Sequence, residues 1–250
     1  MTEALQPAPT AAMLAIGDEL LSGRTKDRNI AHLAGVLTLT GIDLKEVRIV
    51  ADDESAIIEA LNALRDRYDQ VFTSGGIGPT HDDITAEAVA KAFALPLIQH
   101  PEAMDRLARH YAARELPFTE ARMRMARTPE GASLIDNPVS VAPGFQIGNV
   151  FVMAGVPSIF VAMLDNVLPT LPGGPMMESA SVACPFGEGD IGGPLSQIQK
   201  QHPAVAIGSY PRFDGQRYST ELVIRSRDAQ ALAGAREAVE AMVAEMAAKS

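Results

Sequence analysis

The sequence predicts an α/β fold, a three-layer and mainly parallel sheet with helices on both faces, followed by a small α+β domain. Three observations support this prediction. Short apolar runs typical of strands alternate with helical apolar spacing from Met13 to Leu168, which is the pattern of parallel sheets covered by helices. Residues 171–175 are rich in proline and glycine and indicate a linker. After the linker, a strand–helix–strand–strand–helix pattern is typical of a split βαβ unit.

The elements of the larger domain follow from this spacing in chain order. We expect strands where apolar residues run together, over 13–16, 43–50, 71–74 and 149–153. We expect helices where apolar residues recur with helical spacing, over 29–39 (which Gly41 stops), 54–67, 84–93, 101–115 and 156–168. The helix over 54–67 thus presents one apolar face, made by Ile57, Ile58, Leu61 and Leu64. Parallel strands joined by helices end at the same edge of a sheet, and such sheets bind ligands there.

The smaller domain is expected to have strands over 179–184, 204–209 and 217–226 and helices over 195–201 and 228–248. Its last strand alternates, and one side carries Tyr218, Thr220, Leu222 and Ile224. The region has no cluster of ionisable groups, so we expect a scaffold or an oligomerisation element, and a homo-oligomer (dimer or trimer). The predicted divisions are a flexible tail over 1–10, the larger domain over 11–172 and the smaller domain over 173–250.

Composition excludes several classes of function. The net charge of −10 argues against a nucleic-acid partner, whose binding surface would be basic. The single cysteine, Cys184, permits neither an internal disulfide nor a cysteine-based zinc site. No apolar run is long enough to span a membrane, and the first ten residues lack the features of a signal peptide. We therefore expect a cytoplasmic protein without a membrane partner.

The most informative stretch is the loop over 73–85, which joins an expected strand to an expected helix. Three glycines within four positions leave backbone N–H groups bare at the positive end of a helix dipole, which is a site for phosphate. Neighbouring hydroxyl groups can donate to phosphate oxygens. The loop has neither the ending of a Walker A motif nor the acidic residue that follows a dinucleotide fingerprint. The residues expected to bind phosphate or nucleotide are Thr73, Ser74, Gly75, Gly76, Gly78 and Thr80.

Asp82 and Asp83 follow the glycines in the same turn. Carboxylates beside a phosphate would repel it unless a divalent cation lay between them, and their hard oxygen atoms suit Mg²⁺, Mn²⁺ or Co²⁺. We expect both residues to bind the metal and to be catalytic, with Asp18, after the first strand, as a further catalytic carboxylate. The structural alternative is that Thr80 and Asp83 cap the helix and that Asp18 forms an Asx turn. His81 is either a ligand or base or a solvent-facing loop residue.

A basic tract and a turn that contains proline complete the candidates. Arg122, Arg124 and Arg127 form either a phosphate clamp, which would supply the positive charge that the glycine loop lacks, or a solvated face. Asn137 and Gly144 belong to a turn that is expected to border the ligand pocket, and a purely structural role is the alternative.

Four ordered blocks carry a family resemblance: Gly17-Asp18-Glu19-Leu20-Leu21-Ser22-Gly23 with Asp27 and Asn29; the loop over 73–85; Asn137-Pro138 with Ala142-Pro143-Gly144-Phe145; and Gly155-Val156-Pro157-Ser158. Through them the sequence resembles the molybdopterin-binding superfamily of MoaB/Mog type. The closer likeness is to the branch represented by the N-terminal region of the competence/damage-inducible protein CinA. The smaller domain also looks like that branch, through Gly208-Ser209-Tyr210-Pro211. The resemblance covers nearly the whole chain from Ala12.

The resemblance implies the molybdopterin-binding fold and a nucleotide chemistry that depends on a divalent metal. In the CinA branch this chemistry is pyrophosphate hydrolysis of ADP-ribose-like substrates, and the related domain of FAD synthase suggests hydrolysis of FAD. The first alternative comes from the Mog branch, which implies binding or adenylylation of molybdopterin. The second is a non-catalytic ligand-binding protein. The sequence ends before the amidase region of longer CinA proteins, so we expect the stand-alone form.

Two positions depart from the family pattern. The family block Pro-Gly-Val-Pro-Ser-Glu is replaced here by residues 154–159, in which Ile159 stands where the family has an acidic residue. Ser140 stands where the family has a glycine. If the missing carboxylate holds metal or ribose in the family, hydrolysis is weakened or altered in this chain. The expected ligand is a nucleotide or a molybdopterin-type molecule.

Overall fold

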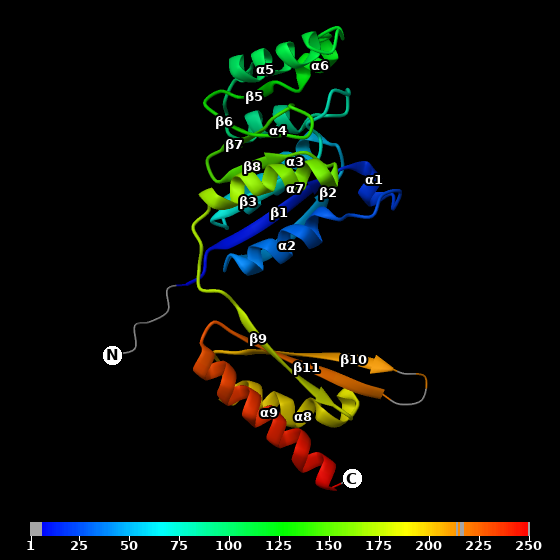
Figure 1. Ribbon diagram of the computed structural model, residues 1–250, viewed down its shortest axis with the longest axis vertical. Coiled ribbons are helices and arrows are strands. Elements are labelled where there is room, and N and C mark those ends of the chain that lie inside the picture. Colours follow the sequence, from blue (N-terminus) through cyan, green and yellow to red (C-terminus); the bar gives the residue numbers. More distant parts are fainter. Residues whose placement is uncertain (1–6, 214, 216–217, 250) are drawn as a thin grey trace, which may run out of the picture. The chain divides into compact units, whose positions relative to one another are not determined.

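The structure, a computed structural model, describes residues 7–213, 215 and 218–249. The chain divides into two compact units, residues 1–174 and 175–250, and each is described by itself (Figure 1). Most of the tail expected over 1–10 lies outside the described residues. Its last residue, Thr10, begins the first strand, and the carbonyl of Pro9 accepts a 2.8 Å hydrogen bond from the amide of Asp43. The sheet therefore starts within the expected tail.

Within the described residues, the first unit contains a six-stranded sheet in the order β2-β1-β3-β8-β7-β6. Its parallel strands are β1 (Thr10–Ile16), β2 (Asp43–Val50), β3 (Gln70–Ser74) and β8 (Val150–Met153). The antiparallel strands β7 (Gly144–Ile147) and β6 (Ser133–Ile135) extend the sheet beyond β8. The prediction of a mainly parallel sheet is confirmed, and the strands predicted for this domain are its parallel ones.

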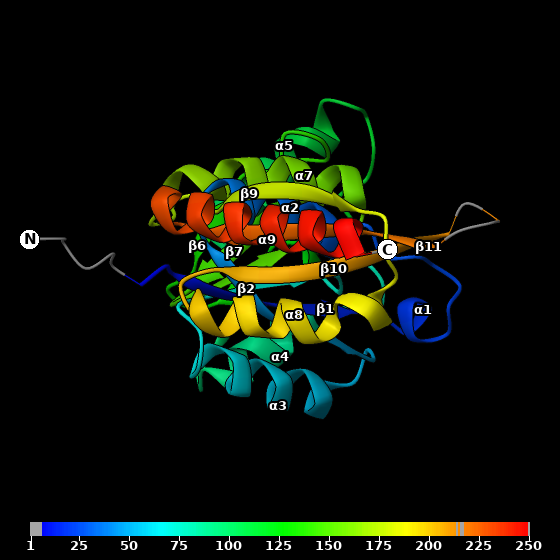
Figure 2. The same ribbon diagram turned by 90° about the horizontal axis from the view of Figure 1, so that it is seen from below.

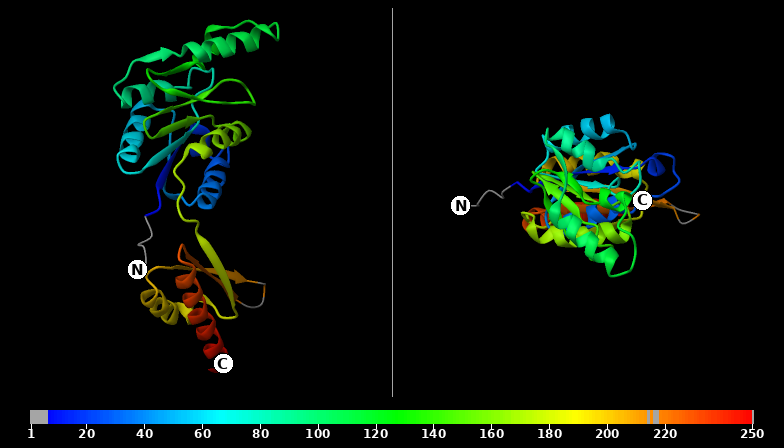
Figure 3. Two further views of the ribbon diagram at one scale, coloured as in Figure 1. Left: turned by 60° about the vertical axis from the view of Figure 1, so that its left-hand side comes forward. Right: turned by 90° about the horizontal axis from the view of Figure 1, so that it is seen from above.

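Helices cover both faces of this sheet. Those of one face are α2 (Asn29–Leu39) and α7 (Pro157–Val167), and those of the other are α3 (Glu54–Arg65) and α4 (Thr85–Ala92), as Figures 2 and 3 show. Successive side chains of β1 point to opposite faces. Met13 therefore belongs to the core beneath α2 and α7, whereas Leu14 belongs to the core beneath α3 and α4. The three-layer prediction is confirmed.

Between α4 and β6 the chain makes an excursion from the main sheet. The excursion comprises β4 (Leu97–Gln99), α5 (Pro101–Ala112), α6 (Glu120–Arg124) and β5 (Arg127–Pro129), with β4 and β5 paired antiparallel. Of these elements, the sequence predicted α5. The others, like α1 (Asp18–Leu21) and the 3₁₀ turn Leu168–Thr170, are too short to show an apolar period.

In the part of the chain that the structure describes, the second unit is a three-stranded antiparallel sheet, β10-β11-β9, with two helices. Its elements are β9 (Glu178–Cys184), α8 (Glu188–Gln201), β10 (Ala206–Phe213), β11 (Tyr218–Ser226) and α9 (Ala229–Lys249). Because β9 and β10 both pair antiparallel with β11, they run parallel to each other, which is the predicted split βαβ arrangement. On the predicted side of β11, Thr220, Leu222 and Ile224 are buried and Tyr218 is exposed. Residue 217, where the strand was expected to begin, lies outside the described residues. No described helix, α9 included, is long and apolar enough to cross a membrane.

Candidate functional site

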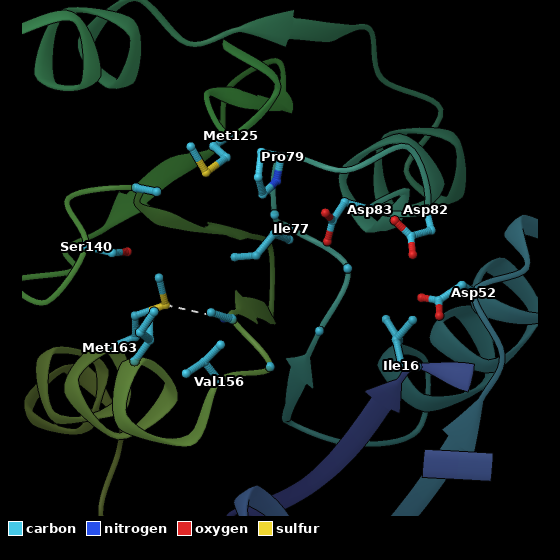
Figure 4. A pocket seen from close by; sticks show the side chains of 18 of the residues that line it. Ile16, Asp52, Ile77, Pro79, Asp82, Asp83, Met125, Ser140, Val156 and Met163 are labelled. Carbon is cyan, nitrogen blue, oxygen red and sulfur yellow. Dashed lines mark hydrogen bonds between the residues drawn. The ribbon is translucent and has the colours of Figure 1, made fainter. Parts of the chain in front are cut away.

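The loops that follow β1, β2, β3 and β8 surround a cavity of about 550 Å³ at the carboxyl edge of the main sheet (Figure 4). The loop after β1 contributes Gly17 and Glu19, and the loop after β2 contributes Asp52. The glycine loop, residues 75–83, follows β3, and residues 154–157 follow β8. In the sheet, β1 has β2 on one side and β3 on the other, so the cavity lies at the switch point where open α/β sheets bind ligands.

The backbone of the glycine loop requires glycine. Gly75 and Gly76 have φ angles of +111° and +67°, in a region that residues with a side chain rarely adopt. A Cβ on Gly75 would lie 2.2 Å from the carbonyl oxygen of Ile16, and a Cβ on Gly76 would lie 2.1 Å from Oγ1 of Thr85. A Cβ on Gly155, in the loop after β8, would lie 3.2 Å from the Cα of Gly75. The missing side chains let the loops after β1, β3 and β8 pack closely together.

The start of α4 holds the glycine loop in place. The amide and the hydroxyl group of Thr85 donate hydrogen bonds, each of 3.0 Å, to the carbonyls of Gly76 and Gly75. The carboxylate of Asp83 accepts hydrogen bonds from the amide (2.8 Å) and the hydroxyl (2.5 Å) of Thr80. Because α4 begins at Thr85, the hydrogen bonds between Thr80 and Asp83 lie in the loop before the helix and do not cap the helix. The helix-cap alternative for Thr80 and Asp83 is therefore wrong in its geometry.

Carboxylates gather on one side of the cavity. Glu19, Asp52, Asp82 and Asp83 line it, and Figure 4 shows the three aspartates together on that side. Burial raises the pKa of the Asp52 carboxyl, a 3.0 Å hydrogen bond from the amide of Asp18 opposes the shift, and the negative charges of Asp18, Glu19 and Asp82 add to it. Asp52 therefore holds a proton more readily than an ordinary aspartate.

Asp52 was not among the residues predicted from the sequence. It comes two residues after β2, which was itself predicted over 43–50. The rule that ligand sites lie beyond the carboxyl ends of parallel strands was applied to Asp18, after β1, and not to this strand. The signal that could have found Asp52 was therefore present.

Asp82 lies in the opposite environment. Its side chain is 61% exposed, and hydrogen bonds with the Thr80 side chain and its own backbone lower the pKa of its carboxyl. His81 is 99% exposed, with Nδ1 at 3.9 Å from Oδ1 of Asp82, so its side chain lies in solvent. Among the described residues, no three histidine, cysteine or acidic side chains are grouped closely enough to hold a metal ion. A cation beside these aspartates would need further oxygen ligands, such as the phosphates of a bound molecule.

The opposite side of the cavity is apolar. Met125, Val156, Ile159 and Met163 line it. Figure 4 shows Met125, Val156 and Met163 on the side of the cavity opposite the aspartates. The sulfur of Met163 accepts a 3.4 Å hydrogen bond from the amide of Ala154. The cavity thus has an acidic side next to the glycine loop and a side suited to an apolar ring.

Asn137 lines the cavity, as predicted, but its side chain is used within its own turn. Its Nδ2 donates to Oγ of Ser140 at 2.6 Å and to the carbonyl of Ala142 at 2.8 Å. Its Oδ1 accepts from the amides of Val139 and Ser140. Asn137 therefore shapes the wall of the cavity, and Ser140, which replaces a glycine of the family pattern, is one of its partners.

Other predicted site residues lie outside the lining of the cavity, namely Asp18, Thr73, Ser74, Thr80 and Gly144. Thr73 is fully buried within β3, and the hydroxyl of Ser74 accepts a 2.7 Å hydrogen bond from the side chain of Asn29. A Cβ on Gly144 would lie 2.3 Å from the carbonyl of Val152, so this glycine serves the packing of the sheet. Sequence reasoning placed these residues beside the right loops but could not tell which way each one faces.

The side chains of the basic tract contact other groups of the protein. Nη2 of Arg124 donates to the carbonyl of Asp83 at 3.1 Å and lies 3.5 Å from Oε1 of Glu87 on α4. Nη1 of Arg127 binds the same oxygen of Glu87 at 2.5 Å. Arg122 instead stacks on an aromatic ring of α5. These arginines are thus engaged within the protein.

Family models match both units of the chain. A probable molybdopterin binding domain matches residues 12–173, and the middle domain of FAD synthase matches residues 176–250. A protein of Pyrobaculum calidifontis is 35% identical over 213 residues, which cover 82% of this chain and 81% of that protein. A CinA-like protein of Desulfosudis oleivorans is 35% identical over 242 residues, which cover 90% of this chain and 57% of that protein. The crystal structure of CinA from Thermoplasma acidophilum, a protein described as of unknown function, is similar with a TM-score of 0.61 and 33% identity, covering 65% of this chain and 98% of that one.

Proposed function

Because the chain belongs to the molybdopterin-binding domain family, in its CinA-like branch, we propose that its cavity binds the diphosphate of a nucleotide with a divalent cation and hydrolyses the pyrophosphate bond. The substrates that we propose are ADP-ribose and FAD-like dinucleotides. The observation that carries the proposal is the position of the glycine loop beside Asp52, Asp82 and Asp83 on one side of a single cavity. Backbone N–H groups and carboxylates on the same side suit an anionic ligand that arrives with a cation.

The donor set fits a hard cation such as Mg²⁺ or Mn²⁺. The carboxylates of Asp82 and Asp83 offer oxygen atoms, and the negative charge gathered on this side of the cavity is what a cation would offset. Mg²⁺ in phosphate-processing sites is commonly held by one or two carboxylates and completed by phosphates and water, so a protein site without three grouped ligands still fits it. When bound, the cation would supply the positive charge that stabilises the pyrophosphate during its hydrolysis.

The residues of the chain then have distinct roles in the proposed reaction. The glycine loop holds the phosphates through backbone N–H groups, and Asp82, whose pKa is lowered, stays ionised to bind the cation. Asp52 accepts the proton of the attacking water, a role for which its raised pKa suits it. The water oxygen forms a bond to one phosphorus atom, and the bond from that atom to the bridging oxygen breaks. The other phosphate leaves with the bridging oxygen.

The apolar side of the cavity is suited to the ring of the ligand. Met125, Ile159 and Met163 line this side. Figure 4 shows Met125 and Met163 away from the aspartates. Ile159 replaces the acidic residue of the family pattern, so a polar group of the ligand finds no charged partner at this position. We expect this exchange to alter the choice of ligand more than the binding of its diphosphate.

A screen of dinucleotides against cations tests the proposal. The purified protein is incubated with ADP-ribose or FAD in the presence of Mg²⁺, Mn²⁺ or Co²⁺, and the mononucleotide products are separated by chromatography. Hydrolysis should require the cation and should be lost in Asp52→Asn. Turnover that is unaffected by chelation of the cation, or by this substitution, would contradict the assignment. Cation-dependent binding without products would leave the non-catalytic alternative.

A second candidate function is the binding or adenylylation of a pterin. It is favoured by the matching model, described as a probable molybdopterin binding domain, and by the apolar side of the cavity. Pterins fluoresce, so the emission of the purified protein before and after denaturation distinguishes this ligand from an adenine nucleotide. Release of a fluorescent pterin would favour this candidate over dinucleotide hydrolysis.

A further inference from the structure

The end of α6 touches the candidate site in two ways. Met125, directly after the helix, lines the cavity. Arg124, the last residue of the helix, reaches the glycine loop from behind, and its Nη2 donates a 3.1 Å hydrogen bond to the backbone carbonyl of Asp83. Asp83 is also a residue whose side chain lines the cavity. The excursion from the main sheet is therefore connected to a proposed cation ligand.

The guanidinium of Arg124 is held by an acidic side chain of α4. Its Nη2 lies 3.5 Å from Oε1 of Glu87, and the same oxygen binds Nη1 of Arg127 at 2.5 Å. The three side chains are only 23–30% exposed. Ion pairs shielded from water in this way are weakened less by salt than exposed pairs. Glu87 thus ties α6 and β5 to α4, the helix that follows the glycine loop.

Arg124 occupies this position with one donor unused. Its Nε is buried and has no hydrogen-bond partner among the described residues. A buried polar group without a partner costs free energy, so the pairing of Arg124 with Glu87 comes at a cost that an apolar side chain would avoid. Its contact with the Asp83 carbonyl supplies a reason connected with the site.

Hydrogen bonds hold both the side chain and the backbone carbonyl of Asp83. Its carboxylate accepts from the amide and the hydroxyl of Thr80, and its carbonyl accepts from Arg124. Two hydrogen bonds at one end restrain the side chain, and the bond at the other end restrains the peptide that carries it. If the contact with Arg124 is lost, the peptide after Asp83 can rotate, and the direction of the carboxylate changes with it.

We propose that Arg124 is a positioning residue of the site. Through the carbonyl of Asp83 it fixes the glycine loop and the direction of the Asp83 carboxylate, which would help to hold a cation, while Glu87 orients the guanidinium. The effect on ligand binding rests on the proposed function. The effect on the loop does not, because it follows from contacts within the protein.

Hydrogen exchange of the whole protein, followed by mass spectrometry, tests the effect on the loop without any ligand. In Arg124→Met, the hydrogen-bonded amides of Thr80 and Asp83 within residues 77–84 should exchange about tenfold faster, as expected for the loss of a hydrogen bond to a charged group. Arg124→Lys should restore part of the protection. Glu87→Gln keeps its size and tests the same link if Arg124→Met fails to fold. Arg106→Met is the matched control, because Arg106 pairs with Glu102 and Asp136 on the surface of α5.

Calorimetric titration with ADP and Mg²⁺ tests the effect on the site. Affinity should fall about tenfold in Arg124→Met, recover in part in Arg124→Lys and stay unchanged in the Arg106 control. Unchanged exchange of residues 77–84 in Arg124→Met would overturn the proposal, and so would faster exchange throughout the first unit, which marks a general structural role. If the unmodified protein binds no ADP, the proposed function fails while the exchange result still decides the role of Arg124 in the loop.

Discussion

Replacing Gly76 with alanine tests the geometry of the glycine loop directly. An alanine at a φ of +67° costs about 1–2 kcal/mol in backbone conformation. Its Cβ would lie 2.1 Å from Oγ1 of Thr85, so the hydroxyl must rotate and give up its 3.0 Å hydrogen bond to the carbonyl of Gly75. Leaving these buried groups unpaired costs about 1–3 kcal/mol more. Gly76→Ala should therefore lower the free energy of unfolding by about 2–5 kcal/mol.

The chain offers a matched control for the backbone contribution. Gly131 has a φ of +79°, and nothing lies within 4 Å of a Cβ built on it. Gly131→Ala should lose only the conformational cost of about 1–2 kcal/mol. Thr85→Ala removes the hydroxyl that clashes with the new Cβ, so the double variant with Gly76→Ala should lose less than the sum of the two single losses. This deficit isolates the contact between the two residues.

The measurements are thermal unfolding by calorimetry and titration with ADP and Mg²⁺. Gly76→Ala should unfold at a lower temperature than Gly131→Ala, and ADP should bind it more weakly, because the displaced loop no longer aims its N–H groups at the phosphates. Equal destabilisation by both substitutions, or strict additivity of Gly76→Ala and Thr85→Ala, would refute the packing argument. Unchanged affinity for ADP in Gly76→Ala would refute the assignment of the loop to phosphate binding.

Three further predictions concern the carboxylates and the second unit. Because the pKa of Asp52 is raised in the folded state, that state binds more protons than the unfolded chain between the ordinary and the raised pKa, so stability falls as the pH rises through that interval. Asp52→Asn should remove this pH dependence and abolish hydrolysis, and it should not destabilise the fold at pH 7. Unfolding followed by calorimetry at several pH values measures the stability of both proteins. A clear loss of stability in the variant at pH 7 would contradict the prediction. Asp82→Asn should weaken cation-dependent ADP binding and leave the melting temperature unchanged. Asp83→Asn should lower both the affinity for ADP and the melting temperature, because its carboxylate also closes the loop. If neither substitution alters the cation dependence of binding, the two carboxylates are structural. A protein ending at residue 174 should keep ADP binding and lose self-association in light scattering, and a folded, monodisperse truncation that binds no ADP would show that residues 175–250 complete the site.

The parallel strands and the helices that cover them could be predicted because each leaves a periodic apolar pattern. The run over 71–74 and the helical spacing of Ile57, Leu61 and Leu64 are burial patterns, and burial is what organises the main sheet. The helix α8 shows the limit of this reasoning. Gly192, Gly193 and Pro194 indicate a break, yet the helix continues through them from Glu188, because buried Ile191 and Ile198 anchor it on the core of its unit.

The candidate site could be predicted in its location but not in the direction of each side chain. The glycine loop could be identified from the sequence because close packing there requires glycine, and the glycines are visible in the sequence. Thr73 and Ser74 immediately precede that loop, yet one is buried in the sheet and the other is bound by Asn29. The sequence placed Arg124 in a basic tract but could not predict its contact with Asp83, since the two are 41 residues apart and the contact is made through a backbone carbonyl.

The charges around the cavity set a condition on any phosphate ligand. The chain carries a net charge of −10, and among the described residues that line the cavity there is no lysine or arginine. Arg124 and Arg127, the nearest basic side chains of the tract, are already paired with Glu87. The dipoles of the glycine loop carry only partial charge, and Asp52, Asp82 and Asp83 line the same side of the cavity as that loop. A diphosphate bound there must therefore bring a cation with it. A cation shared between the ligand and the aspartates explains why carboxylates gather in the cavity, whereas a purely structural role for these carboxylates does not.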